Sequence, residues 1–243
     1  MTIPAKAFQR WLQSIAPDAS TADVCRVSGI KRTTLAQQLV RGKVAVNTVV
    51  SISRAYHANP VASLAGFDDY RVLAGPPQPP TKCELVSQIS TPDLLRALLS
   101  RSAMDPVPGT AAPALGPAPH ATSVKNWVDA IDDGEVRQRV SASTGVAPQN
   151  YSAQLTANRL SPELAMATAV AAGVGPVGGL VATGLVTEEE AGWPAGARQA
   201  ALDSLSDGEL TVLAGDRLQA LGKVLRRHEH DQAQTEKIWE NLG

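Results

Sequence analysis

The hydrophobic pattern of this chain is helical almost throughout. Phe8, Trp11, Leu12 and Ile15 share one face of a helix predicted over residues 6–15. Later segments repeat this three- and four-residue spacing between breaks at glycine, proline and asparagine, and none shows the alternation that is typical of a strand. The pattern therefore predicts an all-α fold made of short helices.

The second and third predicted helices are separated by a short turn that contains glycine. Ser20 or Thr21 begins the second helix and Gly29 ends it. The third helix is predicted over residues 32–40, and Gly42 follows it. A helix, a short turn with glycine and a second helix make up the helix-turn-helix plan.

The same pattern occurs twice along the chain. Residues 8–101 pair with residues 124–217 at an offset of 116 positions without a gap. Identical residues at this offset include Trp11 and Trp127, Ile15 and Ile131, Val24 and Val140, Gly29 and Gly145, Leu39 and Leu155, Leu64 and Leu180, and Leu94 and Leu210. Scattered identities in one register indicate a tandem duplication. The sequence therefore predicts two tandem helix-turn-helix modules, here named copy one and copy two, joined by linkers rich in Pro, Ala and Gly.

Proline-rich stretches suggest where the chain divides. The predicted segments are an N-terminal module over 1–75, a Pro-rich spacer with a short helix over 76–105, a flexible linker over 106–120, a second module over 121–193 and a C-terminal helical segment over 194–243. Ser90 is expected to begin the short helix, and Ser206 with Glu209 forms a capping-box pattern for the C-terminal helix.

The net charge of −1 conceals a difference between the two copies. Residues 1–75 carry nine Lys/Arg and four Asp/Glu, whereas residues 121–193 carry four Lys/Arg and eight Asp/Glu. Affinity for DNA comes largely from the neutralisation of phosphates by cations. Copy one therefore has the charge that a DNA-binding module needs, and copy two is acidic.

The run from Thr21 to Leu64 carries recognisable motifs. Gly29-Ile30 precedes Thr34-Leu35, the tripeptide Arg-Gly-Lys closes the third helix, and Ala-Tyr precedes the final Pro and Leu. This sequence pattern resembles that of the lambda-repressor/Cro-like (XRE-type) helix-turn-helix domain, and more narrowly that of the immunity repressors of actinobacterial phages and prophages. The resemblance implies a DNA-binding transcriptional repressor, and in copy two it is degenerate.

The third helix of copy one presents side chains suited to the major groove. Leu35 and Leu39 face inward on the helical wheel, so polar residues point outward. Glutamine can bond adenine and arginine can bond guanine, while flanking cations hold phosphates. The candidate DNA-binding residues are Lys31, Arg32, Thr33, Thr34, Gln37, Gln38, Arg41 and Lys43.

Copy two keeps the hydrophobic residues but loses most of these cations. Lys31, Arg32 and Arg41 correspond to Ala147, Pro148 and Ala157 at the same offset. The remaining candidates for a secondary DNA contact are Gln149, Asn150, Gln154 and Arg159. Two interpretations of copy two stay open. It is either a weak second DNA-binding module that is tethered to copy one, or a module that contacts protein, and the second interpretation is slightly favoured.

No other chemistry is indicated by the sequence. His228, Glu229, His230 and Asp231 are adjacent, but residues two apart on a helix face different ways, so they do not suit one metal ion. The glycine-rich run 173–179 lacks the Gly-Lys-Ser/Thr of a phosphate loop. We expect no enzymatic activity, no catalytic residue, no metal and no cofactor.

Residues 164–186 carry no charge and equal a membrane span in length. The segment is rich in Ala and Gly with GVGPVGG at its middle, so two short buried helices and a turn are predicted instead. The C-terminal helix is expected to continue past the end of the repeat, and along it Ala214, Leu218, Leu221, Leu225 and His228 follow alternating spacings of four and three. Packing of this stripe against its own domain is favoured over self-association.

The sequence as a whole predicts a sequence-specific repressor on a double-stranded DNA operator, cytoplasmic and nucleoid-associated in a bacterium or a phage-infected host. A flexible joint between unequal modules favours an asymmetric site over a palindrome. The alternative is a DNA-anchored adaptor, or an accessory replication or partition factor, that binds a protein partner or itself through residues 121–243.

Overall fold

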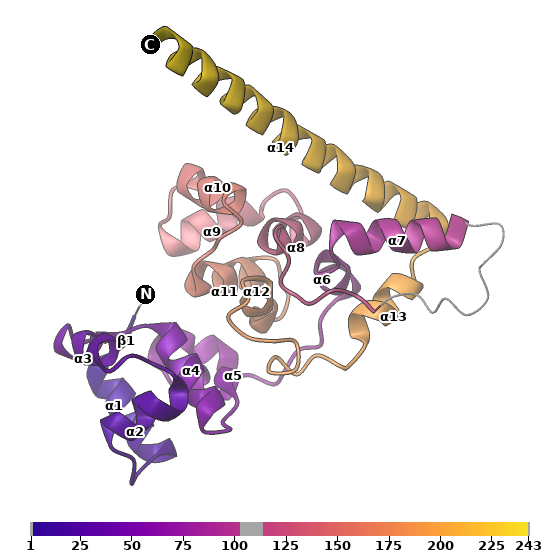
Figure 1. Ribbon diagram of the computed structural model, residues 1–243. Helices are drawn as coiled ribbons and strands as arrows, with labels where there is room; N and C mark the ends of the chain where they lie inside the picture. Colours follow the sequence, from indigo (N-terminus) through magenta and orange to yellow (C-terminus); the bar gives the residue numbers. More distant parts are fainter. Residues whose placement is uncertain (1, 103–113, 243) are drawn as a thin grey trace. The chain divides into compact units, whose positions relative to one another are not determined.

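The computed structural model describes residues 2–102 and 114–242, with side chains to residue 232 except His228. The described chain is mostly helical, which confirms the predicted fold class (Figure 1). The only strands in these residues are β1 (Ile3–Pro4) and β2 (Lys43–Val44), which pair antiparallel with Ile3 opposite Val44. This pair ties the N-terminal segment to the residues that follow the third helix.

The described residues of the first half, 2–102, fold into seven α-helices and one 3-10 helix. They are α1 (Ala5–Ile15), α2 (Thr21–Ser28), α3 (Arg32–Val40), α4 (Val46–Ala55), α5 (Pro60–Ala65), η1 (Asp68–Ala74), α6 (Lys82–Ser87) and α7 (Thr91–Ser102). The helix over residues 32–40 has the bounds expected from the sequence. Ser20 caps α2, because its side chain accepts a hydrogen bond from the Asp23 amide.

The second half repeats these helices. They are α8 (Ser123–Ile131), α9 (Val136–Thr144), α10 (Pro148–Thr156), α11 (Pro162–Ala171), α12 (Pro176–Ala182), α13 (Ala197–Asp203) and α14 (Asp207–Leu242). Each begins within two residues of the position 116 residues after its counterpart, and α3 and α4 correspond to α10 and α11 at both ends. The offset seen in the sequence is therefore also present in the secondary structure.

Left-handed backbone positions fall at the same places in both halves. Such positions favour glycine because a Cβ atom crowds the backbone there. The three pairs are Gly29 (φ 70°) with Gly145 (φ 71°), Gly42 (φ 71°) with Asn158 (φ 50°), and His57 (φ 55°) with Gly173 (φ 71°). A non-glycine residue in one half is thus matched by glycine in the other.

The buried core also corresponds, with one coupled change. Leu35 and Ile52 are fully buried in the first half, and their counterparts Tyr151 and Thr168 are fully buried in the second. The Tyr151 hydroxyl lies 2.8 Å from Thr168 Oγ1, and Thr168 Oγ1 donates to the Leu164 carbonyl. Two apolar side chains are therefore replaced by a hydrogen-bonded polar pair, which avoids an unpaired buried hydroxyl.

The helices form two compact units, each built from both halves. Unit 1 contains Met1–Gln88 and Pro117–Arg198, and unit 2 contains Ile89–Gly116 and Gln199–Gly243. This grouping differs from the linear division predicted from the sequence, because α6 packs on α8 in unit 1 while α7 packs on α14 in unit 2. Of the predicted linker 106–120, residues 106–113 lie outside the described residues.

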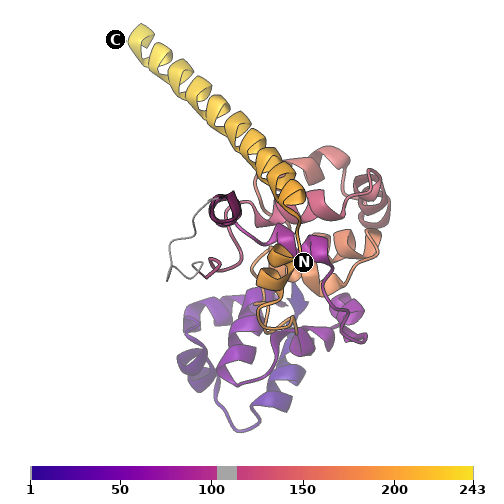
Figure 2. The ribbon, with the colours of Figure 1, turned by 90° about the vertical axis from the view of Figure 1, so that its right-hand side faces the viewer.

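Within unit 1, copy one and copy two are joined by polar contacts. The Arg54 guanidinium donates to Glu190 at 2.6 and 2.8 Å and to the Leu185 carbonyl at 3.1 Å. The Tyr70 hydroxyl donates to Glu163 at 2.7 Å. The helices of copy one (indigo to purple) and those of copy two (pink to orange) form two adjoining clusters (Figure 1, Figure 2).

In unit 2, α7 and α14 pack through a small core of their own. Leu94 and Leu210 are both fully buried there. The predicted Ser206–Glu209 capping box is present, with the Ser206 amide donating to Glu209 at 2.7 Å.

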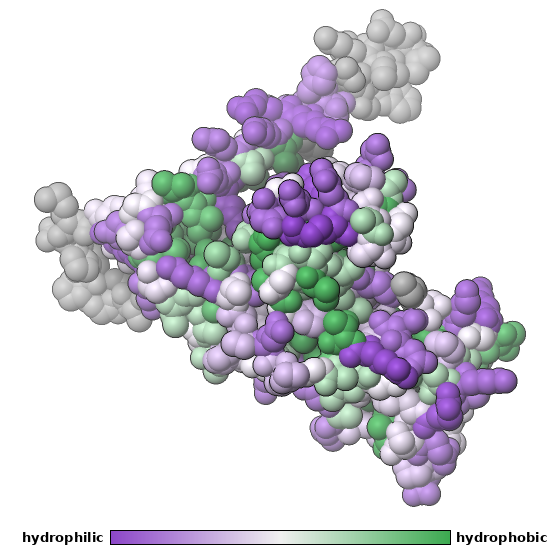
Figure 3. Space-filling view, turned by 180° about the vertical axis from the view of Figure 1, so that it is seen from behind, coloured by the Kyte–Doolittle hydropathy of each residue, from purple (hydrophilic) through white to green (hydrophobic). Residues whose placement is uncertain are grey.

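The predicted packing of the whole stripe on α14 is wrong. Ala214 is buried, but Leu218, Leu221 and Leu225 are 46%, 46% and 51% exposed. The reason is that α7 covers only the first part of α14. Green hydrophobic residues accordingly interrupt the hydrophilic surface along α14 (Figure 3).

The uncharged stretch 164–186 forms most of α11, a turn and α12, as predicted. Among the described helices, none combines the length and the apolar character that a membrane crossing requires.

Candidate nucleic-acid interface

Copy one places α3 after α2 through a turn that the sequence dictates. Gly29 ends α2 at φ 70° with nothing within 4 Å of an added Cβ, so the backbone conformation and not crowding selects glycine. Ile30 packs partly buried against the core, and α3 begins at Arg32. Leu35 is fully buried. Leu39, one turn later, packs partly buried against the same core, so the two leucines fix which face of α3 points outward.

The outward face of α3 carries the residues expected from the sequence. Seven of the eight candidates are exposed, namely Lys31, Arg32, Thr33, Thr34, Gln37, Arg41 and Lys43. Lys43 lies in β2 opposite Pro4, so the strand pair positions it beside the end of α3. The structure brings these residues together on one helix and its two flanks.

Gln38, the eighth candidate, has an internal role that sequence reasoning missed. Its side-chain oxygen accepts hydrogen bonds from the Ala45 amide at 3.1 Å and the Thr48 hydroxyl at 3.0 Å. In copy two, the residue equivalent to Ala45 is Ser161, which caps its own helix. The signal in the sequence was the absence of a capping side chain at Ala45. Since the Gln38 oxygen is occupied, only Gln37 can bond adenine with both amide atoms.

Ion pairs separate the cations of copy one into two groups. Arg26, Arg54 and Arg71 pair with Asp23, Glu190 and Asp68 respectively. Among the described residues, no ion pair involves the four cations beside α3, which are Lys31, Arg32, Arg41 and Lys43. Six of the nine cations of copy one thus lie outside the ion pairs of the described residues: these four beside α3, and Lys6 and Arg10 on α1.

Copy two shows the opposite arrangement. Lys125 pairs with Asp129, Arg137 with Asp132, and Arg139 with both Asp133 and Glu135. Of the four secondary candidates, Gln149, Asn150 and Arg159 are exposed and Gln154 is half-buried. Polar side chains able to contact bases are thus presented on and beside α10, with much less charge to hold phosphates.

The carboxylates that join the two copies are held in their charged forms. The hydrogen bond from Arg54 holds the pKa of Glu190 below its ordinary value. Burial by itself raises the pKa of Glu163, but hydrogen bonds, chiefly from Tyr70, outweigh it and the pKa is lowered. Burial raises the pKa of Tyr70, so its hydroxyl remains a donor. These groups therefore act as fixed charges and donors near neutral pH.

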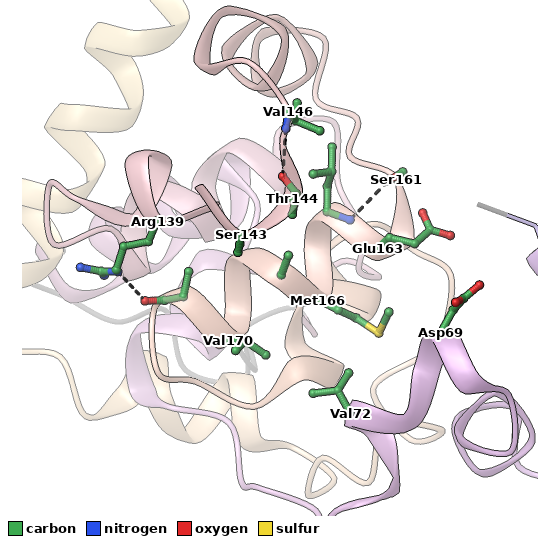
Figure 4. A pocket seen from close by; sticks show the side chains of 13 residues that line it. Asp69, Val72, Arg139, Ser143, Thr144, Val146, Ser161, Glu163, Met166 and Val170 are labelled. Carbon is green, nitrogen blue, oxygen red and sulfur yellow. Dashed lines mark hydrogen bonds between the residues drawn. The ribbon is translucent and has the colours of Figure 1, made fainter. Parts of the chain in front are cut away.

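A cavity of about 690 Å³ lies between η1 of copy one and α9 and α11 of copy two. Asp69 and Val72 line one side, facing Met166 and Val170 across it (Figure 4). Val170 is the counterpart of Arg54, which spans the equivalent place in the other copy to reach Leu185 and Glu190. The shorter valine leaves the space open, so the cavity follows from the divergence of the two copies.

Metal ligands are not gathered in the part of the chain that the structure describes, where no group of three His, Cys, Asp or Glu is placed to hold an ion. The His228 side chain lies outside the described residues. Cys25 is buried and Cys83 is exposed, and neither forms a disulfide.

Comparisons with protein-family models, curated proteins and solved structures give no match to this chain. The resemblance to phage repressors therefore stays a prediction from the residues themselves.

Proposed function

We propose that the protein is a sequence-specific DNA-binding transcriptional repressor of the phage-immunity type, acting in the cytoplasm on DNA. The observation that carries the proposal is the group of uncompensated cations beside α3, Lys31, Arg32, Arg41 and Lys43, around an exposed polar helix face. An α-helix fits the major groove, and cations on both flanks suit the phosphate backbones beside it.

The roles of the residues follow from their chemistry. Thr33, Thr34, Gln37 and Arg41 face outward and read base edges, while Lys31, Arg32 and Lys43 hold phosphates. Gln38 orients the start of α4 behind the reading helix. A repressor of this design acts by occupying its operator and so excluding transcription.

Selection of bound duplexes from a random-sequence pool with the full chain tests this proposal. We expect one enriched sequence, and its loss in a Gln37→Ala, Arg41→Ala variant that still folds by circular dichroism. Enrichment of the same sequence by that variant would show that α3 does not read it.

A second function, contact with protein through α14, is favoured by the exposed Leu218, Leu221 and Leu225. Exposed leucines in a row on a helix are typical of an interaction surface. Sedimentation of the full chain and of Leu221→Asp tests self-association. A mass above that of a monomer for the full chain, but not for Leu221→Asp, supports self-association through α14. The mass of a monomer for both chains would reject self-association in favour of a different protein partner.

A further inference from the structure

The contacts between the two copies in unit 1 are reciprocal. Arg54 on α4 of copy one bonds Leu185 and Glu190, in the segment after α12 of copy two. Glu163 on α11, the counterpart of α4, accepts a hydrogen bond from Tyr70 in η1, the counterpart of that segment. Each copy therefore offers the same two surfaces to the other. Reciprocity of this kind defines a two-fold, or isologous, interface.

A second cavity in unit 1 marks the same symmetry. Its volume is about 300 Å³, and both members of several equivalent pairs line it. These pairs are Asn59 with Gly175, Val61 with Val177, Gly75 with Ala191 and Pro76 with Gly192. A space bounded by both members of each pair lies where the axis relating the copies passes. Copy one and copy two therefore form a dimer-like pair within one chain.

Unit 2 contains equivalent residues in contact as well. Its core joins Leu94 to Leu210 and Ile89 to Leu205, each pair separated by 116 positions. Both compact units thus contain contacts between corresponding parts of the two copies, although the packing of α6 on α8 has no counterpart of similar extent between α13 and α1 among the described residues. Head-to-tail packing of a repeat would instead leave one surface of each copy unmatched.

A two-fold pairing has a consequence for the helices that face DNA. The axis that relates α4 to α11 also relates α3 to α10, and both of these helices lie on the left-hand side of unit 1 in Figure 1. We infer that α3 and α10 of a single chain occupy two halves of one DNA site in opposite orientations, at a spacing set by the packing of the two copies. This inference rests on the proposed function, namely that α3 reads DNA.

The two half-sites are unequal because the two helices are. Gln149 and Asn150 on α10 present amides that can bond bases, whereas Ala147, Pro148 and Ala157 stand where copy one has cations. The second half-site therefore adds sequence preference with little phosphate contact. The operator is expected to contain two half-sites that are bound by helices in opposite orientations but differ in base sequence. This differs from the arrangement expected from the amino-acid sequence alone, in which two modules on a flexible joint bind an asymmetric site.

The relative orientation of the two half-sites can be determined by giving α10 the exposed residues of α3, because both helices should then bind the same base sequence. The six substitutions are Ala147→Lys, Pro148→Arg, Gln149→Thr, Asn150→Thr, Ala153→Gln and Ala157→Arg, and all six positions are exposed, so the core is left intact. The full chain and the grafted chain are each used to select duplexes from a random pool. The grafted chain is expected to select two inverted copies of the strong half-site at one fixed spacing, about one helical turn or a multiple of it.

The outcomes separate the two proposals. Three results would overturn the inference that α3 and α10 bind one DNA site together: selected half-sites in direct repeat, a variable spacing between them, or the same single half-site for both chains. Each of these results would leave the repressor proposal standing. No enriched sequence for the unmodified chain would overturn both. If the grafted chain does not fold, hydroxyl-radical footprinting of the unmodified chain on its own selected duplex decides. Protection of the DNA at two neighbouring major grooves supports binding by both α3 and α10, and protection at one groove rejects it.

Discussion

Arg54 and Glu190, 136 residues apart, form a two-bond ion pair that joins α4 of copy one to the turn after α12 of copy two. The Glu190 oxygen that receives the 2.8 Å bond from Arg54 also accepts one from the Thr187 amide at 2.8 Å, so the carboxylate is held from both copies. Two parallel bonds from one guanidinium fix an orientation as well as a distance. This contact therefore positions the copies within unit 1.

Glu190→Gln is expected to lower the free energy of unfolding by about 1 kcal/mol at pH 7, the scale of a partly exposed charged hydrogen bond. The pKa of Glu190 is lowered in the folded chain. Its contribution is therefore complete above the unfolded pKa of about 4.3 and is lost as the pH falls through the folded value. Urea unfolding of both chains at pH 7 and at pH 3 measures this.

The matched control is Glu189→Gln, which removes the same charge from an exposed neighbour. It is expected to change stability little at either pH. A difference in stability between Glu190→Gln and the parent chain that is as large at pH 3 as at pH 7 would contradict the ion pair.

The Tyr151–Thr168 hydrogen bond predicts strong coupling between two substitutions. Thr168→Val leaves the buried Tyr151 hydroxyl without its partner and is expected to cost about 1–3 kcal/mol. The double variant Thr168→Val, Tyr151→Phe removes both polar groups and should recover part of that loss. Chemical unfolding of the four chains gives the coupling energy. Additive effects would show that the two side chains act independently.

The sequence was sufficient to predict the helices, because capping serines, breaking glycines and helical spacing are local signals. Ser20, Gly29 and Ser206 each stand where a helix begins or ends. The duplication was also visible, since the offset of 116 holds from Trp11 to Leu210. Long-range pairing was not predictable. Nothing near Arg54 in the sequence indicates Glu190, and the internal role of Gln38 depends on where α4 begins.

The prediction that the leucine stripe of α14 packs against its own domain was wrong for a physical reason. A stripe of leucines at spacings of three and four indicates that one helix face is apolar, but not how much of that face another helix covers. Coverage by α7 ends near Ala214, so Leu218 and the leucines after it stay exposed.

Lys43 is expected to contact phosphate and not a base, because it lies beyond the end of α3 in β2. Lys43→Ala should weaken binding to the selected operator and to a shuffled duplex alike, and should reduce the slope of log affinity against log salt by about 1. Titrations at several salt concentrations measure both effects. A loss confined to the operator would assign Lys43 to base reading instead.

Base reading by α3 is tested by the equilibrium affinity of the full chain and of Gln37→Ala for the selected duplex and for a shuffled duplex. Gln37 is exposed on the outward face of α3, so its removal should leave folding intact. Base reading by Gln37 predicts that Gln37→Ala loses roughly 1–3 kcal/mol of binding free energy on the selected duplex and little on the shuffled one. Equal losses on both duplexes, or no preference by the full chain, would contradict it.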